Sequence, residues 1–193
     1  KLFGLGSNDA GASLVSLAAT FLYFYNEETL PYNLIFAATA EEEISGQNGI
    51  ASLLPLLGSV DCALVGEPTG MQMAVAERGL LVLDAETVGV SGHAARGEGV
   101  NALYKAMRDI AWIQGYTFEK SSDFLGPVSM QVTSIATDNT AHNVVPDSCR
   151  YTVDIRLNEC YTHEEVLTTI RENVSAAVTA RSTRLRSSMI NLD

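Results

Sequence analysis

The spacing of apolar residues changes near residue 77, and this change constrains the fold more than any other feature. Before it, helical patterns alternate with short continuous apolar runs at 33–38 and 62–66. After it, stretches of alternating apolar and polar residues begin at 80–90, as is typical of half-exposed strands. The sequence therefore predicts two domains, one over residues 1–77 and one over residues 78–190.

The first domain is predicted to be a partial α/β domain based on a parallel sheet. Helical spacing indicates one helix over residues 8–25 and a second over residues 49–57. The runs 33–38 and 62–66 are continuous and apolar, which is typical of strands buried on both faces of a parallel sheet. Helices that alternate with such strands favour the α/β class.

The second domain is predicted to be a compact α+β module with the order β-α-β-β-α-β. Its first helix is indicated by an apolar stripe over residues 100–113. Its second helix starts at the T-x-x-E capping box of Thr162 and Glu165, and its stripe runs to Ala177. With a last strand over 184–190, this order is that of the split, ferredoxin-like unit.

Composition excludes several classes of partner. The 193 residues carry 23 acidic and 12 basic side chains, a net charge of −11, which argues against nucleic acid and anionic membranes. No apolar run reaches the length of a transmembrane helix. The three cysteines are widely spaced and the first residues do not resemble a secretory signal, so a cytoplasmic location is expected. Both ends fall close to motifs, and we expect the chain to be a piece of a longer protein.

Acidic side chains follow the predicted strands where each strand ends. The segment TAEEEISG, with Glu42 and Glu43, follows the first run, Glu67 follows the second, and Asp9 opens the first helix. Ligands bind outside the carboxyl ends of strands in open parallel sheets, so these carboxylates are expected at one edge, where a divalent cation would offset their repulsion. Each also has a plain alternative, namely a solvated turn for the glutamates and a helix N-cap or helix-dipole partner for Asp9.

Five motifs, in order along the chain, carry a family resemblance. They are GLGSND, TAEEEISG, GEPTG, SGHAARGEGVNAL and HNVVPDSCRYTVDIR. The first three resemble the acidic loops of the metal-dependent aminoacylase and deacetylase family, and the last two resemble its small lid domain. The resemblance spans nearly the whole chain and looks closest to the acetylornithine deacetylase branch, including the type that accepts N-succinylornithine or N-acetylcitrulline.

The resemblance implies a fold class and an assembly. The fold would be a zinc-hydrolase catalytic domain, partial in this chain and based on a parallel sheet, with an inserted ferredoxin-like lid. The family dimerises through this lid, so a homodimer through residues 78–190 is expected. The other partner would be a small-molecule N-acyl amino acid, with no nucleic acid and no membrane.

The resemblance also implies a site with two divalent metal ions, zinc or cobalt. Asp9 would bridge the two ions, while Glu43 and Glu67 would each bind one of them. Glu42 would be the general base, with Glu41 as a flanking residue. The family also uses a histidine in a His-x-Asp segment before the aspartate and another near its C-terminal end. Neither is present here, and carboxylates alone are a weak zinc environment.

Three residues of the lid are implied to act on the substrate. His93 would reach the site of the partner subunit and donate a hydrogen bond to the oxygen on which charge develops. Asn143 and Arg156 would bind the polar end of the substrate, because a guanidinium can pair bidentately with a carboxylate. Taken alone, His93 could be a surface imidazole, and Arg156 could form a surface ion pair with Asp154 on the same strand face.

The leading hypothesis is a zinc-dependent amidohydrolase that removes an acetyl or succinyl group from an amino acid such as ornithine, in arginine biosynthesis. The alternatives within the family are a dipeptidase and a succinyl-diaminopimelate desuccinylase. An alternative of another class is a dimerisation fragment that binds no metal. A phosphate-binding role for the GLG loop is disfavoured, because the loop lacks a third glycine and has an aspartate nearby.

Overall fold

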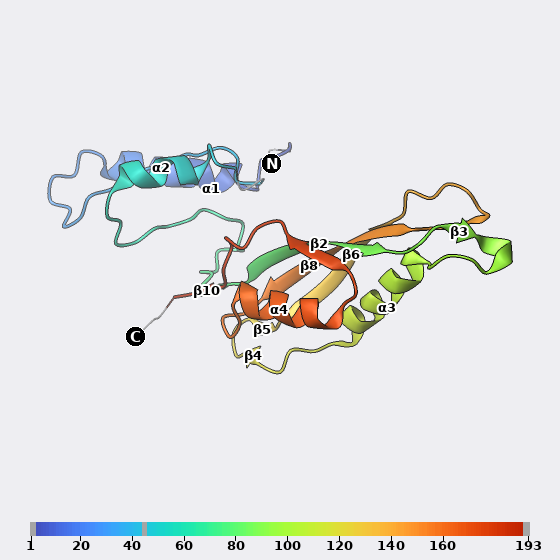
Figure 1. Cartoon of the computed structure of the whole chain (residues 1–193). Coiled ribbons are helices and arrows are strands. Elements are labelled where there is room, and N and C mark those ends of the chain that lie inside the picture. Colours follow the sequence, from blue (N-terminus) through green and yellow to red (C-terminus); the bar gives the residue numbers. More distant parts are fainter. Residues whose placement is uncertain (1–2, 44–45, 191–193) are drawn as a thin grey trace. The chain divides into compact units, whose positions relative to one another are not determined.

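The computed structural model describes residues 3–43 and 46–190. It divides into two compact units, Lys1–Met73 and Ala74–Asp193, so the division falls slightly before the boundary predicted at residue 77 (Figure 1). Within the described residues, no helix is both long enough and apolar enough to cross a lipid bilayer.

The second unit is built on a four-stranded antiparallel sheet with the spatial order β6-β8-β2-β9. Its strands are β2 (Gly79–Val88), β6 (Ser129–Ala136), β8 (Ser148–Leu157) and β9 (Ala177–Ala180). Helix α3 (Ala102–Gly115) connects β2 to β6, and helix α4 (His163–Asn173) connects β8 to β9. This is the predicted order β-α-β-β-α-β, and the strand order is that of a ferredoxin-like sheet.

Three short strand pairs and a turn of 3-10 helix complete the second unit. The pairs are β1 (Ala76–Glu77) with β10 (Ser188–Met189), β3 (Gly92–His93) with β7 (Val144–Val145), and β4 (Ser121–Ser122) with β5 (Gly126–Pro127). The 3-10 helix η1 (Ala94–Arg96) follows β3 directly. In Figure 1, β3 and η1 lie at the end of an arm that extends beyond the sheet.

The core of the second unit lies between the two helices and one face of the sheet. Strands β2 and β8 pair over ten residues, from Gly79↔Leu157 to Val88↔Ser148, and their side chains alternate between buried and exposed. The fully or nearly fully buried side chains of the core include Leu81, Leu83, Val153, Ile155, Ala106, Val166 and Ile170. Each large aliphatic side chain buried in this way contributes about 1.5–3 kcal/mol relative to an exposed one.

The edge strand β6 contains a bulge. Val132 pairs with Val153, whereas Ser134 pairs with Thr152, so Thr133 is an extra residue on the β6 side of the ladder. A bulge of this kind bends the strand and interrupts its row of ladder hydrogen bonds.

The start of α4 confirms the predicted capping box. The Oγ1 of Thr162 accepts a hydrogen bond from the N–H of Glu165 at 3.2 Å, and the Glu165 carboxylate accepts one from the N–H of Thr162 at 2.7 Å. The hydrogen bond from the backbone of Thr162 lowers the pKa of Glu165 below its ordinary value. His163 is the first residue of the helix, and its Nε2 lies 3.0 Å from the carbonyl oxygen of Leu80.

The end of α4 differs from the prediction. The apolar stripe indicated a helix as far as Ala177, but the helix ends at Asn173, and Val174 is extended, with φ −110° and ψ 152°. Residues Ala177–Ala180 then form the fourth strand of the sheet, so the prediction of this strand at 184–190 was wrong.

A buried carboxylate on α3 accounts for this early end. Asp109 is only 4% exposed, and it accepts hydrogen bonds from the N–H groups of Ser175 and Ala176 at 2.9 and 3.0 Å. It also accepts from the hydroxyls of Ser175 and Tyr151 at 3.1 and 3.3 Å. These bonds hold the chain in the turn that leads from α4 into β9. Burial, together with the nearby charge of Asp109, raises the pKa of Tyr151.

The first unit does not contain the predicted parallel sheet. It has α1 (Gly11–Phe24) and α2 (Ile50–Leu57), and its described residues include no strand. The segments 33–38 and 62–66 were predicted to be buried strands, but they have no regular secondary structure, and Val65 is 81% exposed.

The two segments do not form strands because too few other residues surround them. A strand buried on both faces needs neighbouring strands and a covering layer on each side. Both segments contact α1: the rings of Phe21 and Phe36 are 5.9 Å apart, and a Cβ on Gly66 would come within 2.9 Å of Leu17. Among the described residues of this unit, however, only Gly49 is buried, so these segments are covered by too few neighbours to be enclosed as strands.

We predict that Asp109→Asn destabilises the chain by about 2–3 kcal/mol, because an amide loses the charge and turns donors toward the donors of Ser175 and Ala176. Urea unfolding monitored by circular dichroism measures this change. Glu172→Gln on α4, an exposed position, is the matched control and should change stability by less than about 0.5 kcal/mol. Equal stabilities for the two variants would contradict the role given to Asp109.

Candidate functional site

The predicted metal ligands all lie in exposed turns of the first unit. Asp9 precedes α1, whose N-cap residue is Ala10 and has no side-chain cap. Glu43 lies in the turn after the segment 33–38, and Glu67 is exposed where its carbonyl oxygen accepts a hydrogen bond from Thr69 N–H at 2.9 Å. The capping alternative for Asp9 is therefore not observed.

The three adjacent glutamates have different environments. Glu41 has a positive φ of 60°, and its carboxylate accepts hydrogen bonds from the backbone N–H and the side-chain amide of Asn48, both at 3.0 Å. It therefore closes its own loop. Glu42 and Glu43 are exposed in the turn that follows.

Across residues 3–43 and 46–190, the structure gathers no group of three or more His, Cys, Asp or Glu side chains that could hold a metal ion. The residues present therefore do not fit the two-metal site that the resemblance implied, and their geometry supports no chemical step through a metal. The assignment of Asp9, Glu43 and Glu67 as ligands stays a prediction.

The second unit brings two predicted substrate residues together at the end of its arm. His93 pairs with Val144 in the short β3–β7 ladder, and the N–H of Ala94 donates to the carbonyl oxygen of Asn143 at 2.9 Å. The arm is tightly folded at this point, since a Cβ on Gly92 would lie 2.5 Å from backbone atoms of Glu98. His93 and Asn143, 50 residues apart in the sequence (143 − 93), are thus neighbours.

The ring of His93 is oriented by the chain itself. Its Nδ1 accepts a hydrogen bond from the N–H of Ala95 at 3.2 Å, and η1 is capped at its end by Gly97, which has a left-handed φ of 66°. In a neutral imidazole one nitrogen accepts and the other carries the proton. Because the backbone N–H of Ala95 can only donate, the neutral ring carries its proton on Nε2. The exposed side of His93 is therefore a hydrogen-bond donor.

Arg156 lies on the open face of the sheet and forms the ion pair that the sequence left as an alternative. Its Nε and Nη2 donate to the two carboxylate oxygens of Asp154 at 2.8 and 3.1 Å. The Arg156 side chain is 48% exposed, so the guanidinium also faces solvent.

His93 and Arg156 lie at opposite ends of one strand pair. Strand β8 begins at Ser148, next to the arm, and Arg156 is eight positions further along it. At about 3.3 Å per residue, these two ends are roughly 26 Å apart. A single chain therefore does not present His93 and Arg156 to the same small molecule.

The ferredoxin-like sheet with its projecting arm defines the class of protein. It is a small α+β domain with two helices and a four-stranded antiparallel sheet. A family model described as the peptidase dimerisation domain of M20 peptidases matches residues 75–180, from just before β1 to the end of β9. The chain belongs to the M20 peptidase family.

Curated relatives extend the likeness to the first unit. Succinyl-diaminopimelate desuccinylase 2 of Ruegeria sp. (strain TM1040) is 29% identical over 188 residues, which cover 91% of this chain and 47% of the relative. Succinyl-diaminopimelate desuccinylase of Dinoroseobacter shibae is 29% identical over 191 residues, which cover 94% and 50%. The chain spans about half the length of the curated relatives it matches.

Solved structures show the same fold. An amidohydrolase or peptidase from Burkholderia cenocepacia aligns with a TM-score of 0.51 over 62% of this chain and 31% of that chain. At 18% sequence identity, this likeness concerns the fold alone.

Sequence reasoning missed the contribution of Ala95, because a backbone N–H leaves no mark in residue identity. The segment HAARG does carry a signal, since a histidine directly before a short turn that ends in glycine can cap that turn with its ring nitrogen. Sequence reasoning also missed Asp109, whose partners lie on a turn 66 and 67 residues away.

We predict that the neutral ring of His93 carries its proton on Nε2, because Nδ1 accepts the hydrogen bond from Ala95. Long-range ¹H–¹⁵N correlation spectra of the ¹⁵N-histidine-labelled chain distinguish the two ring nitrogens. His163 is an internal control, because its Nε2 faces the carbonyl oxygen of Leu80 and must donate. The chain has three histidines, and the signals that disappear in the His142→Gln variant are those of His142. A proton on Nδ1 of His93 would contradict the hydrogen bond from Ala95.

Proposed function

We propose that the protein to which this chain belongs hydrolyses the amide bond of an N-acyl amino acid, with N-succinyl amino acids as its first substrate class. The observation that carries this proposal is the arm, on which an M20 dimerisation domain presents the Nε2–H of His93 beside Asn143. The names of the curated relatives support the succinyl alternative over the acetylornithine hypothesis.

The residues of this chain would divide the chemistry among them. Glu42, exposed in its turn, would take a proton from the attacking water and return it to the leaving amine. The Nε2–H of His93 would donate to the carbonyl oxygen of the amide as negative charge develops there. Arg156 would pair with a carboxylate of the substrate. Asp9, Glu43 and Glu67 remain the predicted ligands of the implied metal ions, and no step is assigned to those ions, because the described residues do not gather to hold them.

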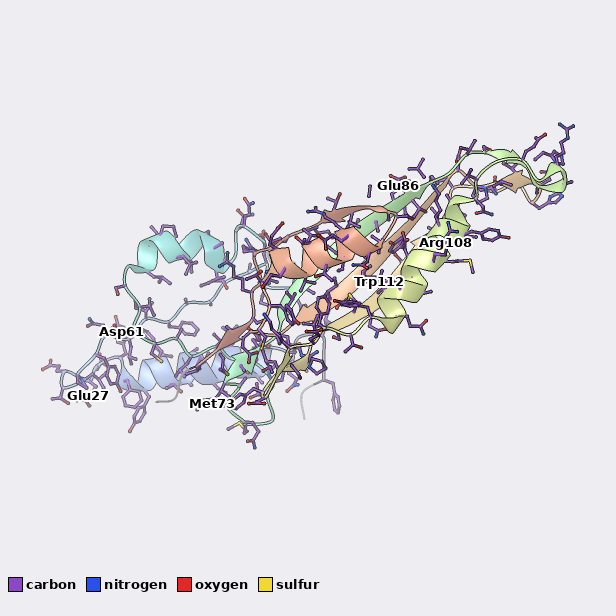
Figure 2. The ribbon with its side chains drawn as sticks, turned by 60° about the horizontal axis from the view of Figure 1, so that its bottom comes forward. Glu27, Asp61, Met73, Glu86, Arg108 and Trp112 are labelled. Atoms are coloured by element: carbon purple, nitrogen blue, oxygen red, sulfur yellow. The ribbon has the colours of Figure 1, made fainter. Side chains whose placement is uncertain are left out.

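The separation of His93 from Arg156 favours a site shared between two subunits. A substrate the size of an N-acyl amino acid cannot span roughly 26 Å of strand. The His93 and the Arg156 that contact one substrate molecule would therefore come from different chains. The surface for pairing would be the free edge of β6 together with the exposed side of α3, where Tyr104 and Met107 are 63% and 55% exposed. Figure 2 marks this helix by Arg108 and Trp112.

One observation favours a second candidate for the isolated chain. A dimerisation-domain model matches residues 75–180, and a module that pairs subunits without catalysing a reaction would account for this match by itself. Metal analysis of the purified chain distinguishes the two candidates, because a zinc-free chain that still dimerises supports only the second.

We predict that the complete protein hydrolyses N-succinyl-diaminopimelate faster than N-acetylornithine, and that Glu42→Gln lowers turnover about 10²–10⁴-fold because the proton acceptor is lost. Release of the free amine measures the rate. Glu41→Gln is the neighbouring control, since glutamine keeps one of the two oxygens that accept from Asn48. Normal turnover by the Glu42 variant would refute its role as base, and equal loss in both variants would point to loop damage instead.

We predict that mixed dimers restore activity. His93→Ala chains and Glu42→Gln chains should each be inactive alone. A heterodimer of the two should have up to about half of the activity of the wild-type dimer, because one of its two shared sites combines an intact His93 with an intact Glu42. Activity is measured on heterodimers purified by two different affinity tags. Verified heterodimers with no recovered activity would show that both residues serve a site within one chain.

A further inference from the structure

We infer that Asp154 is a positioning residue that holds Arg156 by one edge and presents the other edge of its guanidinium to an acidic group of the substrate. This inference rests on the proposed function, because it concerns how Arg156 recognises a carboxylate. It adds a residue to the site that touches Arg156 and not the substrate.

The geometry of the pair defines the two edges. A guanidinium can bind a carboxylate bidentately through Nε and one terminal nitrogen, or through its two terminal nitrogens. Asp154 occupies the first edge, with both of its oxygens on Nε and Nη2 of Arg156 at 2.8 and 3.1 Å. Within residues 3–43 and 46–190, no group bonds to Nη1 of Arg156, so the edge of Nη1 and Nη2 is open.

The two side chains are placed for this arrangement by the strand. Asp154 and Arg156 are two positions apart on β8, so both point to the open face of the sheet. Their side chains are 29% and 48% exposed, respectively. The carboxylate is therefore the more covered of the two, and the open edge of the guanidinium is the part available to a ligand.

Two effects of Asp154 on substrate binding oppose each other, and their magnitudes decide the expected result. Its charge repels a second carboxylate, but across a solvated guanidinium this repulsion is weak, on the order of RT or less. Its hydrogen bonds fix a long arginine side chain that would otherwise lose rotamer freedom on binding, which is worth about 3- to 10-fold in affinity. Orientation therefore outweighs repulsion, and removing Asp154 should weaken binding.

A neighbouring pair provides a matched control on the same sheet face. Arg181 donates through Nε and Nη2 to both oxygens of Asp84 at 2.8 and 2.7 Å, the same side-on geometry. The hydrogen bond from Arg181 holds the pKa of Asp84 below its ordinary value. Arg181 has no place in the proposed substrate site. Asp84→Asn should thus weaken an equivalent ion pair and leave substrate binding unchanged.

The test compares Asp154→Asn, Asp154→Glu and Asp84→Asn in the complete protein. The substrates are an N-succinyl amino acid with a free α-carboxylate and its α-carboxamide analogue. We expect Asp154→Asn to raise KM for the carboxylate about 3- to 10-fold with little change in kcat, and to leave KM for the carboxamide unchanged. Asp154→Glu should recover part of the loss, and Asp84→Asn should match the wild type.

An unchanged or lower KM for Asp154→Asn, or an equal change for both substrates, overturns the inference. If the wild-type protein hydrolyses neither substrate, the proposed function fails separately, and succinate binding measured by calorimetry tests the inference alone. Weaker succinate binding by Asp154→Asn than by wild type and Asp84→Asn then supports it, and equal or absent binding in all three overturns it. Urea unfolding of each variant checks that the fold is retained.

Discussion

The ten-residue pairing of β2 with β8 is the constraint on which the second unit depends. Because side chains alternate along each strand, this register puts Leu81, Leu83, Val153 and Ile155 on the face covered by the helices, and a slip of one residue would expose all of them. The same ladder sets the length between the arm and Arg156. The core and the spacing of the predicted substrate residues are thus fixed by a single set of backbone hydrogen bonds.

The two units differ in how much of their apolar surface they bury. The second unit buries large side chains from both helices and the inner face of its sheet. In the first unit, Val15, Leu22 and Leu56 are 68%, 69% and 80% exposed. Large apolar side chains that are exposed in this way do not pack the elements of the unit against one another. Packing among the described residues of the first unit therefore does not fix the positions of its carboxylates relative to one another.

The features that sequence predicted well are those set by nearby residues. Alternation located β2 and β8, helical spacing located α1 and α3, and the capping box marked the start of α4. The predictions that failed concern features that are set by residues distant in the sequence. The end of α4 is set by Asp109, which lies 66 residues from Ser175, and burial of 33–38 and 62–66 requires covering layers that the pattern of a segment cannot supply.

The candidate site likewise combines features that the sequence predicted with features that it did not. The motifs identified His93, Asn143 and Arg156 as residues of interest, but not how each is held. The backbone N–H of Ala95 sets the ring of His93, and a strand ladder brings Asn143 beside it. The pairing of Arg156 with Asp154 was visible as an alternative, since they are two residues apart on one strand. Its side-on geometry, which leaves one edge open, is a matter of side-chain conformation that spacing does not determine.

The bulge at Thr133 has a consequence for colloidal behaviour. An unbroken edge strand offers a template on which further strands can add without limit, the route to fibrils and precipitates. In β6 the extra residue splits this template into two short segments that are out of step with each other. A flat strand from an unrelated chain can match only one segment at a time, so the edge discourages indiscriminate stacking.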